Sequence, residues 1–109
     1  MKLPSDSKIA AEKIRNYLLE WRAENDKSAF LSLAGYEAEQ WEVLAADLRT
    51  QVLSLDARFV ELTSYGEMYE IRGGLIGPNG VSLKVVTIWM TEHVTAQTKF
   101  ITLFPAKEV

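Results

Sequence analysis

The spacing of apolar residues changes near residue 56, and this change constrains the fold more than any other feature. Before it, apolar residues recur every three or four positions, as on one side of a helix; after it they alternate, as in strands. Turn signals, Gly73-Gly74 and Gly77-Pro78-Asn79-Gly80, divide the second half. The sequence therefore predicts an α+β fold, with N-terminal helices packed on an antiparallel sheet of about four strands.

Three helices are predicted before residue 56. The first covers about residues 7–22, after possible N-cap oxygens on Ser5, Asp6 and Ser7, and its apolar side holds Ile9, Ile14, Tyr17, Leu18 and Trp21. The second covers about 27–34, and Gly35 is placed to end it with a left-handed cap. The third covers about 37–53, with apolar residues Trp41, Leu44, Ala45, Leu48 and Val52.

Four strands are predicted after residue 56, at about 57–63, 67–73, 82–90 and 98–104. The third run is apolar on both faces, which is typical of a strand in the centre of a sheet. Pro105 ends the last strand.

Length and composition are those of an ordinary globular domain, and we expect one domain over residues 1–109. No apolar run approaches the roughly 20 residues of a membrane span, the first residues do not resemble a secretory signal, and there is no cysteine. These features predict a cytoplasmic protein without membrane contact. A formal net charge of −3 counts against broad binding of RNA phosphates but leaves room for a small basic site.

Most patterns that would carry chemistry are absent. His93 is the only histidine and lies in a polar loop, where we expect exposure to solvent, and no pattern of metal ligands or bound cofactor accompanies it. There is no nucleophile motif, and the turn at Gly77 lacks the residues of a phosphate loop. The acidic pairs are expected to be solvated charges, namely Glu67 with Glu70 and Asp47 with Asp56.

One set of side chains suits a ribonuclease that works without a metal. Cations stabilise charge that develops on a phosphate, and phenols or hydroxyls relay protons. The set consists of Lys27, Arg58, Tyr65, Tyr69, Arg72, Thr87 and Thr102. For Thr87 and Thr102 a structural role is the alternative, because a hydroxyl in an apolar strand needs a hydrogen-bond partner.

Several short motifs together resemble a family of uncharacterised small bacterial domains, a domain of unknown function that also occurs at the C-terminal ends of polymorphic-toxin-like proteins. The resemblance extends from Lys2 to Pro105 and is carried by Asp26-Lys27-Ser28-Ala29-Phe30-Leu31, Gly35-Tyr36, Tyr65-Gly66-x-x-Tyr69, Gly73-x-x-x-Gly77-Pro78-Asn79-Gly80, Thr87-Ile88-Trp89 and Thr102-Leu103-Phe104-Pro105. The layout of helices followed by a four-stranded sheet is similar, by fold analogy, to that of the barnase, EndoU, colicin and RelE-like ribonuclease toxins.

The resemblance implies a set of catalytic residues: Lys27, Tyr65, Tyr69, Thr87 and Thr102. The chain departs from the family pattern at two places. Glu24-Asn25-Asp26 stands where relatives often have a basic or histidine-containing stretch, and Lys99 stands where they often have arginine. The acidic stretch counts against a phosphate site near Lys27.

Three functions follow as expectations. The first is a toxin-type, metal-independent endoribonuclease or a degenerate relative, with its candidate residues gathered in one cleft. The second is a non-enzymatic module that binds a protein partner from a two-gene unit, such as an antitoxin, immunity or regulatory protein, through an exposed apolar or acidic surface. The third is a homo-oligomer that pairs through the edge strand at 58–63 or 99–104.

Overall fold

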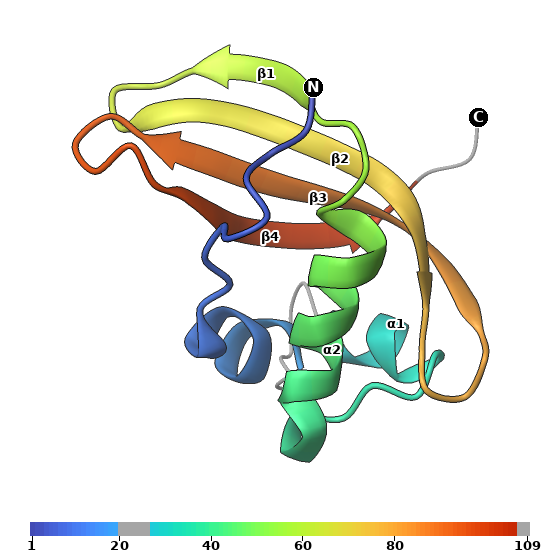
Figure 1. The fold of residues 1–109 in the computed structure, drawn as a ribbon. Coiled ribbons are helices and arrows are strands. Elements are labelled where there is room, and N and C mark those ends of the chain that lie inside the picture. Colours follow the sequence, from blue (N-terminus) through green and yellow to red (C-terminus); the bar gives the residue numbers. More distant parts are fainter. Residues whose placement is uncertain (20–26, 107–109) are drawn as a thin grey trace.

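The computed structural model describes residues 1–19 and 27–106, and it has the predicted α+β layout. Short helices come first in the chain and lie on one face of a four-stranded sheet (Figure 1). The strands are β1 (Arg58–Leu62), β2 (Gly66–Ile76), β3 (Ser82–Glu92) and β4 (Thr98–Pro105).

Every strand pairs antiparallel with the next one in the chain, in the order β1-β2-β3-β4. This arrangement follows from the short loops between the strands, because two consecutive strands joined by a tight turn pair as an antiparallel hairpin. The segment at 82–90, which is apolar on both faces, lies in β3. This strand is in the interior of the sheet, between β2 and β4, as predicted. The register shifts at two places, between Phe59 and Glu61 in β1 and between Ile88 and Trp89 where β3 meets β4.

The helical part contains η1 (Lys13–Leu18), α1 (Ser28–Ser32), η2 (Ala38–Gln40), α2 (Trp41–Asp47) and η3 (Leu48–Val52). The last three follow one another without a break and correspond to the third predicted helix. In Figure 1 they form the upright green coil that leads into β1. None of the helices in the described part of the chain is long and apolar enough to cross a membrane.

The first helix starts later than predicted, because Lys8 is paired with β4 instead. The Lys8 amide donates to the Thr98 carbonyl at 2.8 Å, and the Phe100 amide donates to the Lys8 carbonyl at 2.8 Å. An edge strand leaves backbone groups without partners, and the N-terminal segment satisfies some of them. The predicted end of this helix, with Trp21, lies outside the described residues.

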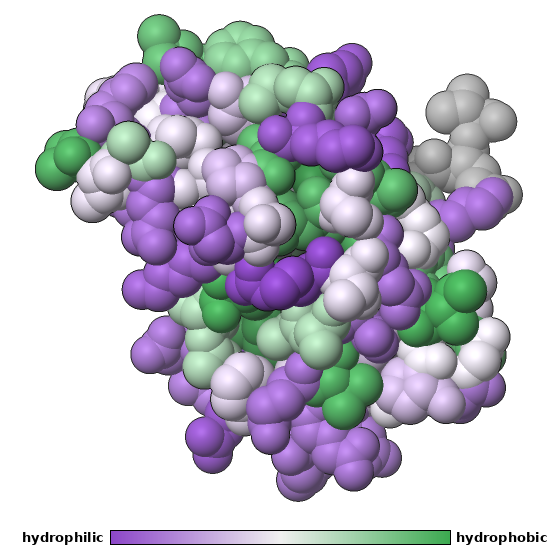
Figure 2. All heavy atoms as spheres, viewed as in Figure 1, coloured by the Kyte–Doolittle hydropathy of each residue, from purple (hydrophilic) through white to green (hydrophobic). Residues whose placement is uncertain are grey.

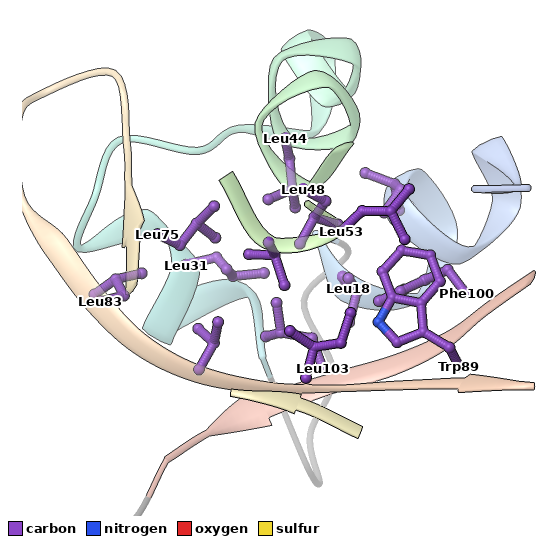
Figure 3. Close-up of a cluster of buried hydrophobic side chains, with 14 of the residues drawn as sticks. Leu18, Leu31, Leu44, Leu48, Leu53, Leu75, Leu83, Trp89, Phe100 and Leu103 are labelled. Atoms are coloured by element: carbon purple, nitrogen blue, oxygen red, sulfur yellow. The ribbon is translucent and has the colours of Figure 1, made fainter. Parts of the chain in front are cut away.

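The core lies between the helices and the inner face of the sheet (Figure 3). Trp89 and Phe100, opposite each other on β3 and β4, pack edge to face with ring centres 5.3 Å apart. Leu18 from η1, Leu44 from α2 and Leu48 from η3 are fully buried in the same core. The apolar spacing of the sequence therefore marks real packing surfaces.

The β2–β3 turn is docked onto the end of α1. Gly35 has a φ of 89°, the left-handed conformation predicted for a helix cap. The Asn79 side chain donates to the Leu33 carbonyl at 3.0 Å, and its backbone amide donates to the Ala34 carbonyl at 3.3 Å. Residues 77–80 thus form a hairpin turn that also fixes the position of α1.

Candidate functional site

Three polar side chains meet at the β4 edge of the sheet. The Lys27 ammonium donates to the Thr102 hydroxyl at 2.7 Å and to the Tyr17 hydroxyl at 3.3 Å. The same Lys27 nitrogen lies 5.0 Å from the centre of the Tyr17 ring. We call Tyr17, Lys27 and Thr102 the edge triad. The sequence placed Lys27 and Thr102 in one site, and their side chains do meet.

Each member of the edge triad is held by a different element. Lys27 directly precedes α1, and its carbonyl accepts the first helical hydrogen bond, from the Leu31 amide at 3.0 Å. Thr102 follows the irregularity in β4: Trp89 faces Phe100 and Ile88 faces Thr102, so Ile101 has no opposite residue on β3. A β-bulge of this kind changes the direction of the side chains around it, and bulges often lie beside active sites.

Tyr17 comes from η1, whose hydrogen bonds span five residues, as in the bond from the Leu19 amide to the Ile14 carbonyl at 3.0 Å. This wide π-type turn leaves Ile14 and Leu18 fully buried, whereas Tyr17 is 37% exposed. Single π-type turns are rare and often occur at functional sites. The phenol therefore lies at the rim of the core, between the covered sheet and solvent.

The surroundings of Tyr17 favour its anionic form. Hydrogen bonds from Thr102 and then from Lys27 lower the pKa of the phenol below its usual 10.0, and the positive charges of Lys27 and Lys13 act in the same direction. Burial acts against them. The Lys13 ammonium lies 5.7 Å from the centre of the Tyr17 ring. A tyrosine of lowered pKa beside a lysine and a hydroxyl is the type of group that can move protons.

Thr87 lies apart from the edge triad, in the core. It is fully buried, its hydroxyl donates to the Ile71 carbonyl at 3.1 Å, and it accepts a hydrogen bond from the Trp89 indole at 2.8 Å. Its polar atom is thus satisfied by the protein itself. Thr87 thus has the structural role that the sequence analysis gave as the alternative to a catalytic one. We therefore leave Thr87 out of the site that we propose.

Tyr65 and Tyr69 also lie apart from the edge triad. Tyr69 is on β2, with β3 between it and Thr102, a separation of roughly 10 Å between strands. Its hydroxyl donates to Glu67 at 2.6 Å, and this bond is the main reason why its pKa is raised. Tyr65 lies in the β1–β2 turn with 76% of its surface exposed. The structure therefore brings two of the five predicted residues together, Lys27 and Thr102.

The remaining charged candidates form local pairs. Glu70 binds the guanidinium of Arg58 at 2.6 Å and that of Arg72 at 3.4 Å, and these three line a shallow hollow with Asp56. His93 is exposed, as predicted, and its ring nitrogen lies 3.2 Å from the Thr63 carbonyl. Within residues 1–19 and 27–106, no three His, Asp or Glu side chains gather in a way that could hold a metal ion.

Tyr17 is the member of the edge triad that sequence reasoning missed. Helical spacing placed it on the buried side with Ile14 and Leu18, and an aromatic residue there suggested packing. One signal could have found it: Lys13 precedes it by four residues, so that the cation and the ring lie on one side of a helix. Its other partners are 10 and 85 residues away and could not be inferred from local pattern.

Together these observations define a small α+β domain in which an antiparallel meander, covered by helices on one face, carries a lysine-tyrosine-threonine cluster at its last strand. The chain belongs to the family described as Domain of unknown function (DUF6883), whose model matches residues 2–107. No curated protein and no solved structure matches the chain. Membership in a family of uncharacterised domains is thus confirmed, and the analogy to ribonuclease toxins stays a prediction.

Proposed function

We propose that this protein is a toxin-type endoribonuclease that cleaves RNA at the edge triad without the help of a metal ion. The observation that carries the proposal is the position of the Lys27 ammonium, within hydrogen-bond distance of both the Thr102 hydroxyl and the Tyr17 phenol. A cation, a hydroxyl and a phenol of lowered pKa are groups that can supply the acid, the base and the charge stabilisation for cleavage of a phosphodiester that has a neighbouring 2′-hydroxyl.

The reaction assigns one role to each side chain. The Tyr17 phenolate takes the proton of the 2′-hydroxyl, and the 2′-oxygen forms a bond to phosphorus. The bond from phosphorus to the 5′-oxygen breaks, and the leaving oxygen takes a proton from the Lys27 ammonium. The products are a 2′,3′-cyclic phosphate and a 5′-hydroxyl, and exchange with water returns the two protons. The Thr102 oxygen accepts a hydrogen bond from Lys27 and holds it in place. Its single proton is donated to the Tyr17 phenolate at rest, and to a phosphate oxygen once Tyr17 has been protonated.

The test is cleavage of a labelled oligoribonucleotide by the purified chain in the presence of a chelator. Lys27→Met and Thr102→Val should each lower the rate by about a hundredfold or more, the usual cost of losing a group that stabilises transition-state charge. Lys2→Met is the matched control. Lys2 is also an exposed lysine, but its partners are Ser54 and Asp56, which do not belong to the edge triad. All variants are checked for folding by circular dichroism.

Two results would count against this function. One is RNA that stays intact with the wild-type chain; the other is cleavage that Lys27→Met leaves unchanged. A substrate with a single 2′-deoxy sugar at the cleaved position gives a further check. It has no internal nucleophile, so it should resist the enzyme completely.

Exposed apolar side chains on β1 favour a second candidate function, the binding of a protein partner. All five residues of β1 are exposed, and the large apolar ones are 52% exposed at Phe59, 46% at Val60 and 65% at Leu62. Figure 2 shows hydrophobic atoms at the top of the molecule, where Figure 1 places β1. Apolar groups gathered in this way often mark an interaction surface.

The shape of β1 favours a different protein over a second copy. The register shift between Phe59 and Glu61 is a bulge that interrupts the strand edge, and bulges hinder pairing of one edge with another. A partner encoded beside this chain, such as an antitoxin or immunity protein, would pack on the side chains. Co-purification with that neighbour, lost in Leu62→Asp and kept in Thr95→Asp, would support this function; a dimer of the chain alone would contradict it.

A further inference from the structure

A pocket lined by lysines lies beside the edge triad. It has a volume of about 260 Å³ and is formed by the N-terminal segment, the start of η1 and the β3–β4 hairpin. Its polar rim holds Lys8, Lys13, Lys99 and Glu92, and its apolar wall includes Met90 and Ile101. In Figure 1 the N-terminal segment (blue) meets β4 and then leads into the first helix, which explains how these lysines converge. We call this the lysine pocket.

The lysine pocket and the edge triad are neighbours. Lys13 lines the pocket, and its ammonium also lies 5.7 Å from the Tyr17 ring. Along β4, Lys99 lines the pocket and Thr102 belongs to the triad. These two residues are three positions apart, a distance of roughly 10 Å along a strand. Neighbouring phosphates of one strand can therefore contact the two places at once.

The pocket carries positive charge on an acidic protein. Three lysines stand against Glu92, which is 3.4 Å from Lys99 and therefore neutralises one of them. The formal charge of the lining is +2, whereas that of the whole chain is −3. A concave site of one sign attracts the opposite charge strongly, even on a surface of the other sign. The pocket is thus a place for an anionic group.

We propose that the lysine pocket binds the phosphate next to the one that is cleaved, so that the substrate is a single RNA strand of several nucleotides. This inference rests on the proposed function and specifies its substrate. Duplex RNA is recognised across two grooves over a broad basic surface, which a formal net charge of −3 does not favour. A single strand needs only a short basic groove, with apolar side chains beside it.

The test compares substrates with and without the second phosphate. A dinucleoside monophosphate carries the scissile phosphate alone, and a ten-nucleotide RNA carries its neighbours as well. The double variant Lys8→Gln, Lys99→Gln should cleave the longer RNA about tenfold more slowly at moderate salt and cleave the short one like the wild type. Its binding should also depend less on salt, with a slope lower by about 0.7 for the loss of one phosphate contact to a single strand.

Binding of an uncleavable 2′-O-methyl ten-nucleotide RNA separates this inference from the proposed function. The wild type should bind it, the double variant should bind it about tenfold more weakly, and Lys2→Gln should bind it like the wild type. Equal affinity of wild type and double variant would overturn the pocket's role, even if the chain cleaves RNA. Weaker binding in the double variant would support it, even if no RNA is cleaved.

Two further outcomes would overturn the inference. The first is an equal loss of rate on both substrates. It would mean that the two lysines stabilise the fold around β4 and do not bind the neighbouring phosphate. The second is tighter binding of a poly-glutamate peptide than of the RNA, which would identify the pocket as a site for an acidic protein segment. Thermal unfolding of the double variant shows whether the lost pair of Lys99 and Glu92 has changed stability.

Discussion

At the scale of single residues, the decisive feature is that Tyr17 accepts hydrogen bonds from groups that stabilise its anion. If the phenolate is the base, the cleavage rate should rise with pH and level off near a pKa below the usual 10.0. Tyr17→Phe should lower the rate by about a hundredfold and remove this rise. Rates measured from pH 6 to 10, in steps of about half a unit, provide the profile.

A second variant separates the pKa of Tyr17 from its mere presence. Lys13 contributes positive charge near the phenol without a hydrogen bond to it. Lys13→Gln should therefore shift the rising part of the profile to higher pH and leave the plateau rate on a dinucleoside monophosphate unchanged. A profile that stays in place in Lys13→Gln, or that survives in Tyr17→Phe, would mean that another group takes the proton.

The candidate site could be predicted only in part, for a reason that also belongs to this scale. Lys27 and Thr102 were expected to act together, and they meet at 2.7 Å. Tyr65, Tyr69 and Thr87 have side chains of the same chemical kinds, but residue type does not show which hydroxyl the protein itself satisfies. That depends on contacts between strands, such as the one from Trp89 to Thr87.

At the scale of elements, the sequence predicts best where one local rule decides. All four strands lie where alternating residues and turn signals placed them, and their ends differ from the predicted ones by at most three residues. The first helix shows the opposite case. Its predicted start at residue 7 depended on the N-cap residues Ser5 to Ser7 and on apolar spacing. In the structure the backbone groups of β4, about 90 residues later, pair with Lys8 instead. Local pattern cannot reveal such a partner.

The five-residue helix α1 leads to a prediction about stability. A helix this short is not stable alone, so its position depends on the β2–β3 turn beneath it. A Cβ at Gly77 would overlap the Ala34 carbonyl and its Cβ. Gly77→Ala should therefore lower the free energy of unfolding by about 1–3 kcal/mol, as measured in urea.

Gly74→Ala is the matched control for this substitution. Gly74 lies three residues earlier, inside β2, and a Cβ there would meet only the Ser82 hydroxyl at an ordinary 3.5 Å. We expect its unfolding free energy to stay within about 0.5 kcal/mol of the wild-type value. Equal values for the two variants would show that the contact between the turn and α1 is not tight.

At the scale of the whole molecule, the long helical stretch is joined to the sheet by a buried phenol. Tyr36 is almost fully buried, and its hydroxyl donates to Asp47 in α2 at 2.7 Å and to the Ile76 carbonyl in β2 at 3.3 Å. Burial, followed by the hydrogen bond to Asp47 and its negative charge, raises the pKa of Tyr36 far above 10.0. The folded protein therefore keeps this proton where the unfolded chain loses it.

Stability should consequently fall in alkaline solution. Below pH 10 Tyr36 is protonated in both the folded and the unfolded state, so it causes no pH dependence. Above pH 10 the unfolded state binds fewer protons than the folded state. Each further pH unit therefore lowers the free energy of unfolding by up to about 1.4 kcal/mol. Tyr36→Phe removes the proton from both states and should flatten this decline, although it lowers stability at neutral pH by about 1 kcal/mol through the lost hydrogen bond. Urea unfolding at pH 7, 10 and 11 decides the matter. A decline of equal slope in Tyr36→Phe would assign the alkaline loss to other groups, of which Tyr69, with its own raised pKa, is the first to replace.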